Sequence, residues 1–217
     1  MIDFQDARTA MVDCQVRPSD VTKYTIIDAM LTVPREIFVP QQFRNVAYAG
    51  EHIPLTDGRV VLDPRVTGKM LDALALAPED LVLNIGCGMG YMAALIGRMT
   101  EAVIALEADE DLAGQAAELL MQSEADNVVV EHGPLQEGAP QHGPYDVIVI
   151  EGAIEVLPAG LETQLKEGGR IAAIFSEGAI GQCRVGLLKN GAITWRRAFD
   201  ATAPILVGFE REKSFDF

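Results

Sequence analysis

From residue 80 onward, short apolar runs alternate with stretches in which apolar residues recur at helical spacing. Runs rich in β-branched residues predict strands, because these side chains fit a buried, pleated surface. The expected strands are residues 81–85, 102–106, 128–130, 147–150 and 169–175, and the expected helices are 91–99, 112–122 and 161–165. Strands that are apolar on both faces and separated by helices are typical of a parallel sheet covered on both sides. The pattern therefore predicts a doubly wound α/β fold.

The two ends of the chain follow other patterns. Near the N-terminus, helical spacing starts at residue 21 after a possible cap at Ser19 or Asp20, and Pro34 closes this helix. Prolines and glycines between residues 38 and 64 predict an irregular arm with short strands, and helical spacing returns over residues 66–76. The two ends are thus expected to add elements to the α/β core.

After residue 182 the pattern changes to that of a hairpin. Asn190-Gly191 stands between two apolar runs and predicts a type I′ turn. Residues 205–209 are expected to form a last strand. We expect a single domain made of N-terminal helices and arm (1–78), a core (79–176) and C-terminal strands (177–217).

Composition and charge mainly exclude functions. The 217 residues are 49% hydrophobic, and 17 Lys+Arg against 32 Asp+Glu give a net charge of −15. So acidic a surface repels phosphates, which argues against nucleic acid and anionic membranes as partners. The three cysteines are far apart and form no CxxC pair, so neither a disulfide framework nor a metal site is expected. Because no apolar stretch is long enough to span a membrane and the first residues are acidic, we expect a cytoplasmic protein.

Three glycines lie between the first core strand and its helix, at Gly86, Gly88 and Gly90. Glycine lets the backbone turn tightly and lets a ligand approach without meeting a Cβ. A dinucleotide loop (GxGxxG) would need glycine at position 91, where the chain has Tyr91. The observed GxGxG spacing instead fits a nucleoside with an amino-acid tail, which is the S-adenosylmethionine pattern, although a purely structural turn stays open.

A carboxylate at the end of the second strand supports the cofactor interpretation. Glu107 follows Gly86 by 21 residues, where an acid can accept hydrogen bonds from both ribose hydroxyls. Asp109 and Glu110 follow, so the position of the acid is open by two or three residues. Asp146, which begins the fourth strand, is equally compatible with a loop cap and with a cofactor contact.

These residues and the N-terminal half resemble the protein-L-isoaspartate O-methyltransferase family over about residues 8–175. The N-terminal positions that carry the resemblance are Arg8, Met11, Val12, Gln15, Ala29, Met30, Val33, Pro34, Arg35, Glu36, Phe38, Val39, Pro40, Ala47 and Tyr48. In the core they are Val82, Leu83, the glycine loop, Tyr91, Tyr145, Asp146, Pro158, Gln164, Leu165, Gly168, Gly169 and Arg170.

This resemblance implies a fold, a cofactor and a set of site residues. The fold is a Rossmann-like S-adenosylmethionine-dependent methyltransferase fold, with a mostly parallel seven-stranded sheet and an N-terminal helical and extended arm. The cofactor is S-adenosyl-L-methionine. The positions that the family pattern assigns to it are Asn84, Gly86, Cys87, Gly88, Gly90, Glu107, Pro134, Leu135 and Glu151.

The sequence departs from the family pattern near the expected methyl acceptor. The family has a serine two residues before a proline, and this catalytic position is Leu62, whose alkyl side chain cannot donate a hydrogen bond. The neighbouring threonine position is Val60. Arg59 is a catalytic candidate that could compensate, because a guanidinium can bind a carboxylate through two hydrogen bonds.

Further departures concern the cofactor positions. The family acid in the glycine motif is Asn84 here, and its threonine after the fourth strand is Glu151. The family's Gly-Asp-Gly after the third strand is Gly133-Pro134-Leu135, so the acid near the adenine is lost, and its Pro-x-Gly after the fifth strand is residues 174–176, Ile-Phe-Ser. Together they set this site apart from the pattern of the family's isoaspartyl repair enzymes while leaving the cofactor fold intact.

Four functions are weighed from the sequence. The favoured one is an O-methyltransferase that acts on a carboxylate of an isoaspartyl-type protein or peptide, or of an altered acceptor. A carboxylate is ionised at neutral pH, so the reaction needs positioning and desolvation and no general base. The alternatives are a small-molecule methyltransferase with a small carboxylate substrate, and a cofactor-binding or interaction protein without turnover. Base methylation of nucleic acid conflicts with the net charge and with the residues 150–153, Ile-Glu-Gly-Ala.

Overall fold

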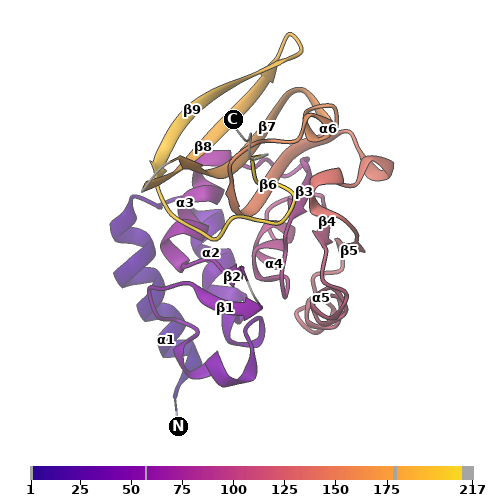
Figure 1. Ribbon diagram of the computed structural model, residues 1–217. Helices are drawn as coiled ribbons and strands as arrows, with labels where there is room; N and C mark the ends of the chain where they lie inside the picture. The colour runs from indigo at the N-terminus through magenta and orange to yellow at the C-terminus, as the bar shows by residue number, and fades with distance from the viewer. Residues whose placement is uncertain (1, 57, 178–179, 212–217) are drawn as a thin grey trace, which may run out of the picture.

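A computed structural model describes residues 2–56, 58–177 and 180–211 of the chain. Seven strands form one sheet in the order β5-β4-β3-β6-β7-β8-β9 (Figure 1). The parallel strands are β3 (Leu81–Ile85), β4 (Ala102–Glu107), β5 (Val128–His132), β6 (Tyr145–Ile154) and β7 (Leu165–Glu177). β8 (Ile180–Lys189) and β9 (Ala192–Asp200) continue the sheet in antiparallel pairing. The predicted doubly wound α/β fold and its mostly parallel seven-stranded sheet are confirmed.

Alternate residues of the central strands belong to two separate hydrophobic clusters, one on each face of the sheet. Val82 lies opposite Val103 and Val147, and these side chains pack into the larger cluster. Leu83 lies opposite Ile104, and both belong to the other cluster. Because both faces are buried, the strands read as continuous apolar runs, and this made them predictable.

The two faces have different coverings. The larger cluster contains residues of α2 (Tyr24–Thr32), α3 (Pro64–Leu74), α4 (Tyr91–Gly97) and α5 (Glu110–Gln122). The other cluster contains residues of the short helix α6 (Ala159–Glu162), Leu135 from the 3₁₀ helix Leu135–Glu137, and Leu206 and Phe209 from the irregular C-terminal segment. The C-terminal segment therefore forms part of the core on the side of the sheet that lacks long helices.

The N-terminal arm consists of short elements. α1 (Phe4–Met11) continues into the π-helix Val12–Val16 and the 3₁₀ helix Arg17–Ser19, and two more 3₁₀ helices span Arg35–Ile37 and Gln41–Val46. β1 (Ile53–Thr56) and β2 (Arg59–Val61) form a separate antiparallel hairpin. The predicted irregular arm with short strands is confirmed, and Figure 1 shows this hairpin near α4.

Two predictions about helices are wrong in detail. Neither Ser19 nor Asp20 caps α2, because Lys23 is its N-cap and makes no side-chain capping bond. Asp20 instead adopts a left-handed conformation (φ 65°) at the end of the preceding 3₁₀ helix. The helix predicted over residues 161–165 ends at Glu162, because Leu165 already begins β7.

The C-terminal hairpin is confirmed, and the last strand is wrong. Asn190 and Gly191 both have positive φ (53° and 73°), as a type I′ turn requires. Residues 205–209 contribute only an isolated bridge between Ile205 and Ala153. The side chain of Leu206 packs over Gly86 and Gly152 of the core.

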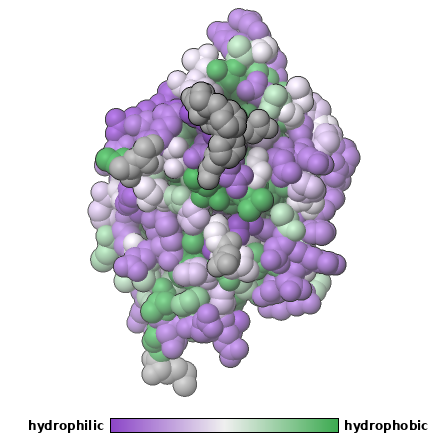
Figure 2. Space-filling view, viewed as in Figure 1, coloured by the Kyte–Doolittle hydropathy of each residue, from purple (hydrophilic) through white to green (hydrophobic). Residues whose placement is uncertain are grey.

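The surface carries many hydrophilic residues (Figure 2). Figure 2 shows that hydrophilic residues cover most of the viewed face. None of the described helices is long and apolar enough to cross a membrane.

Candidate functional site

The glycine loop joins β3 to α4 at the carboxyl edge of the parallel strands. Gly86, Gly88 and Gly90 all have positive φ (77°, 57° and 95°), a conformation that other residues rarely adopt. The amides of Gly86 and Cys87 donate to the carbonyl of Leu106 at 2.8 and 3.1 Å, which fixes the loop against β4. The loop thus places its backbone beside the end of the second strand.

Glu107 is the last residue of β4, and its side chain is fully buried. Its carboxylate accepts hydrogen bonds from the amides of Gly88 (2.7 Å), Ala108 (2.9 Å) and Asp109 (3.1 Å). Asp109 Oδ1 accepts from the amide of Leu112 and caps α5. Of the neighbouring acids considered from the sequence, Glu107 is therefore the one that lies against the glycine loop.

Arg59, on β2, binds this same carboxylate. Its Nη1 lies 2.6 Å from Glu107 Oε1 and its Nη2 lies 2.8 Å from Oε2, while Nη2 also donates to the carbonyl of Gly86 at 2.9 Å. Burial lowers the pKa of Arg59, but the hydrogen bonds and the charge of Glu107 outweigh it and raise the pKa. In this structure the carboxylate that Arg59 holds is one of the chain's own; its predicted contact with an acceptor carboxylate stays a prediction.

Asn84 and Glu151 share one face of the sheet. Asn84 pairs with Val149 in the register of β3 and β6, and Glu151 lies two residues further along β6. Glu151 is only 5% exposed, and its Oε1 has no hydrogen-bond partner among the described residues. Burial raises the pKa of Glu151 to about 8, against the opposing effects of Asn84 and Arg59. At neutral pH this side chain is therefore largely protonated.

A pocket of about 600 Å³ lies beside the end of β4. It is lined by Thr56, Gly58, Arg59, Ala108, Asp109, His132, Gly133, Pro134, Leu135, Gln136, Ile205 and Val207. Its volume is in the range of ligand sites for small molecules. Of the predicted site residues, Arg59, Pro134 and Leu135 line the pocket.

Two leucines that the sequence did not single out cover the glycine loop. A Cβ placed on Gly88 would lie 2.6 Å from Leu55 Cδ1, and one on Gly86 would lie 3.4 Å from Leu206 Cδ1. The side chain of Leu206 also lies over Gly152, where a Cβ would come within 2.5 Å of Cγ. No local signal could have found these contacts, because they join segments that are far apart in the chain.

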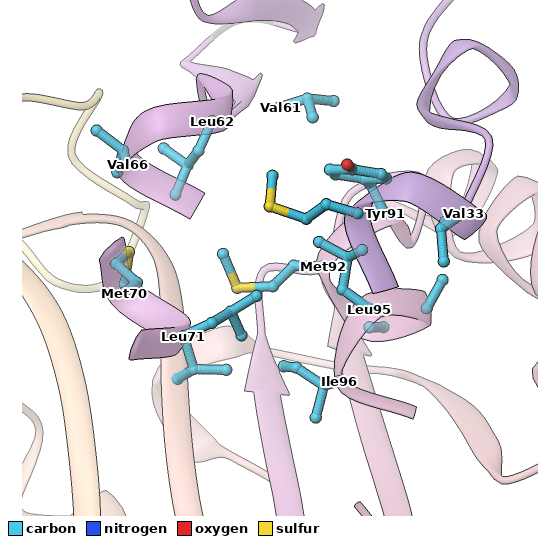
Figure 3. Packing of buried hydrophobic residues seen from close by; sticks show 14 of the residues in the cluster. Val33, Val61, Leu62, Val66, Met70, Leu71, Tyr91, Met92, Leu95 and Ile96 are labelled. Carbon is cyan, nitrogen blue, oxygen red and sulfur yellow. The ribbon is translucent and has the colours of Figure 1, made fainter. Parts of the chain in front are cut away.

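Leu62, which stands at the family's serine position, is fully buried in the larger hydrophobic cluster. Figure 3 shows it close to Val66, in the same cluster as Tyr91. Its carbonyl accepts a hydrogen bond from Nη2 of the buried Arg35 at 2.8 Å, and the guanidinium of Arg35 lies over the ring of Tyr91. Arg35 thereby connects the N-terminal arm both to this segment and to the first residue of α4.

The structure also shows what surrounds Cys87 and Asp146, two further positions considered from the sequence. Cys87 is buried, and burial raises the pKa of its thiol well above the usual value, so it is not a thiolate at neutral pH. Asp146 accepts from the amide of Leu81 (2.9 Å) and from Lys166 Nζ (2.7 Å). Asp146 therefore connects β6 to its two neighbours in the sheet, β3 and β7.

The parallel sheet with its antiparallel extension, the glycine loop after β3 and the acid at the end of β4 define the class of Rossmann-like methyltransferases. Within this class, the sequence model of protein-L-isoaspartate(D-aspartate) O-methyltransferases matches residues 7–190. The chain belongs to this family.

Individual relatives agree with this assignment. The protein-L-isoaspartate O-methyltransferase of Roseiflexus castenholzii is 38% identical over 170 residues, which are 78% of each chain. That of Aliivibrio fischeri is 31% identical over 172 residues, 79% of this chain and 83% of its own. The resemblance stated from the sequence is thus confirmed.

Solved structures show the same fold. A protein-L-isoaspartate O-methyltransferase superposes with a TM-score of 0.79 at 21% identity, covering 95% of this chain and 66% of the other. A Plasmodium falciparum protein assigned to the family, solved in complex with S-adenosyl-L-homocysteine, gives a TM-score of 0.79 at 19% identity, covering 95% and 99%. At these identities the comparison establishes the fold alone.

Proposed function

We propose that this chain is an S-adenosylmethionine-dependent O-methyltransferase that methylates a carboxylate of an isoaspartyl-type protein or peptide. Membership of the protein-L-isoaspartate O-methyltransferase family supports this activity. The observation that carries the cofactor part is the buried carboxylate of Glu107, which lies against the glycine loop and beside the pocket.

The residues fit the family's cofactor at its nucleoside end. The pocket adjoins Glu107 and offers apolar walls at Ala108, Pro134 and Leu135 for a base. Glu107 would accept from the ribose hydroxyls, and the glycine loop would let the backbone approach the rest of the molecule. At the loop itself, the fit requires Arg59 to leave Glu107.

When bound, the cofactor supplies a methyl group that is already activated on a sulfonium sulfur. The acceptor carboxylate is ionised at neutral pH, so the chain does not need to remove a proton from it. What remains for the chain is to hold the acceptor in line with the methyl group and to exclude water. Arg59 is our candidate for holding the acceptor, since it is the cation of the pocket lining and a guanidinium binds both carboxylate oxygens.

The test is methyl transfer to a synthetic isoaspartyl peptide. The full chain is incubated with methyl-labelled cofactor and the peptide, and base-labile methyl ester is counted; the same peptide with normal aspartate is the control. We expect label on the isoaspartyl peptide alone. If no label appears and S-adenosylhomocysteine still binds in calorimetry, the proposed acceptor is wrong and the proposed cofactor stands.

The cytoplasmic location stays a prediction.

A further inference from the structure

The carboxylate of Glu107 is saturated with donors from the chain itself. Oε1 accepts from Arg59 Nη1 and from the amides of Ala108 and Asp109, and Oε2 accepts from Arg59 Nη2 and the amide of Gly88. An ionised carboxylate offers about four lone-pair positions, and here five donors use them. No acceptor capacity is left for two ribose hydroxyls while Arg59 stays in place.

The β1–β2 hairpin, which carries Arg59, also fills the space above the glycine loop. Arg59 Nη2 would lie 3.3 Å from a Cβ on Gly86, and Leu55 Cδ1 would lie 2.6 Å from a Cβ on Gly88. Leu55 belongs to β1 and Arg59 to β2, so one small element supplies both contacts. The glycines leave room for a ligand, and in this structure side chains of the β1–β2 hairpin use part of that room.

Resting on the proposed function, we propose that Arg59 competes with the cofactor ribose for Glu107, and that the β1–β2 hairpin releases the glycine loop when cofactor binds. The apparent affinity for the cofactor is then the intrinsic affinity multiplied by the fraction of molecules in which the Arg59–Glu107 pair is open. Release also frees the guanidinium, which makes it available to an acceptor carboxylate only after the cofactor has entered. Arg59 is thus an affinity-determining residue for the cofactor.

The test is calorimetric titration of S-adenosylhomocysteine into the full chain and into Arg59→Met. Methionine keeps much of the length of the side chain and removes the donors to Glu107 and to the Gly86 carbonyl, while Glu107 retains its three backbone donors. We expect Arg59→Met to bind at least tenfold more tightly than the unchanged chain. The matched control is Arg65→Met, an exposed arginine on α3, which should bind as the unchanged chain does.

A second variant separates competition from a loss of folding. Arg59→Lys keeps the charge but cannot bind both carboxylate oxygens and the Gly86 carbonyl at once. Its affinity for S-adenosylhomocysteine should therefore lie between that of the unchanged chain and that of Arg59→Met. Equal or weaker binding by folded Arg59→Met and Arg59→Lys overturns the competition and leaves cofactor binding intact. If S-adenosylhomocysteine binds neither the unchanged chain nor any of the variants, both this inference and the cofactor part of the proposed function are wrong.

Discussion

Glu107 is the residue on which cofactor affinity depends most directly in our proposal. Glu107→Gln keeps the shape of the side chain but removes the charge and half of the acceptor capacity that two ribose hydroxyls need. We expect S-adenosylhomocysteine to bind at least tenfold more weakly in calorimetry, with folding checked by circular dichroism. Glu110→Gln, exposed in the first turn of α5, removes the same charge three residues away and serves as the control. An unchanged affinity in Glu107→Gln would show that the ribose contact is wrongly assigned.

Glu151 makes stability depend on pH. Its pKa is raised by burial from the ordinary 4.5 to about 8, so between these values the folded chain keeps a proton that the unfolded chain releases. The stabilising effect is fully present below pH 4.5 and is lost as the pH rises towards 8, with a slope of at most about 1.4 kcal/mol per pH unit. Glu151→Gln removes this titration and should flatten the curve.

Urea unfolding of the two chains at pH 5, 6, 7 and 8 measures this effect. The stability of Glu151→Gln relative to the unchanged chain should rise steadily with pH. Glu118→Gln, exposed on α5, should parallel the unchanged chain. Parallel curves for Glu151→Gln as well would mean that the carboxyl group is already ionised in the folded state.

At the scale of the element, the type I′ turn between β8 and β9 tests how much one backbone conformation contributes. Gly191 has a φ of 73°, and a Cβ there meets nothing within 4 Å, so Gly191→Ala costs only the left-handed conformation, about 1–2 kcal/mol. Gly114 lies inside α5 and also has free space around it, so Gly114→Ala should stabilise by about 0.5–1 kcal/mol. Thermal melts of the two variants should therefore shift in opposite directions; a common direction would contradict the conformational argument.

Most elements could be predicted because their signals are local. The central parallel strands β3, β4, β6 and β7 supply residues to the clusters on both faces, and the hairpin is specified by two turn residues. The segment 205–209 shows where this reasoning fails. Its apolar residues look like a strand, but Leu206 packs over Gly152 and only one bridge to Ala153 forms. A run of apolar residues predicts burial, and tertiary packing decides in which conformation.

The site, too, has a part that the sequence predicts and a part that only the folded chain shows. Glu107 could be found because a strand end and a glycine loop lie a fixed distance apart in this class of fold. Its partner Arg59 is 48 residues away, in an arm whose position depends on how the whole N-terminal region packs. The sequence could propose a carboxylate for Arg59 to bind, but only the folded chain shows which one it holds here.

For the whole molecule, the net charge of −15 bears on the choice of acceptor. The proposed substrate is itself an anion, so the field of the protein opposes its approach, and basic residues flanking the isoaspartyl group should favour it. We expect KM to be several-fold lower for a lysine-flanked isoaspartyl peptide than for a glutamate-flanked one at about 10 mM salt. The field is long-ranged there, since the screening length is about 30 Å.

Salt separates this field from direct contacts. At about 0.5 M salt the screening length falls to a few ångströms, so the two KM values should converge while kcat stays the same for both peptides. A glycine-flanked isoaspartyl peptide is the control, and its KM should change less than that of either charged peptide. If the ratio of the two KM values persists at high salt, particular side chains at the pocket contact the flanking residues. The overall charge then does not set the preference for lysine-flanked peptides.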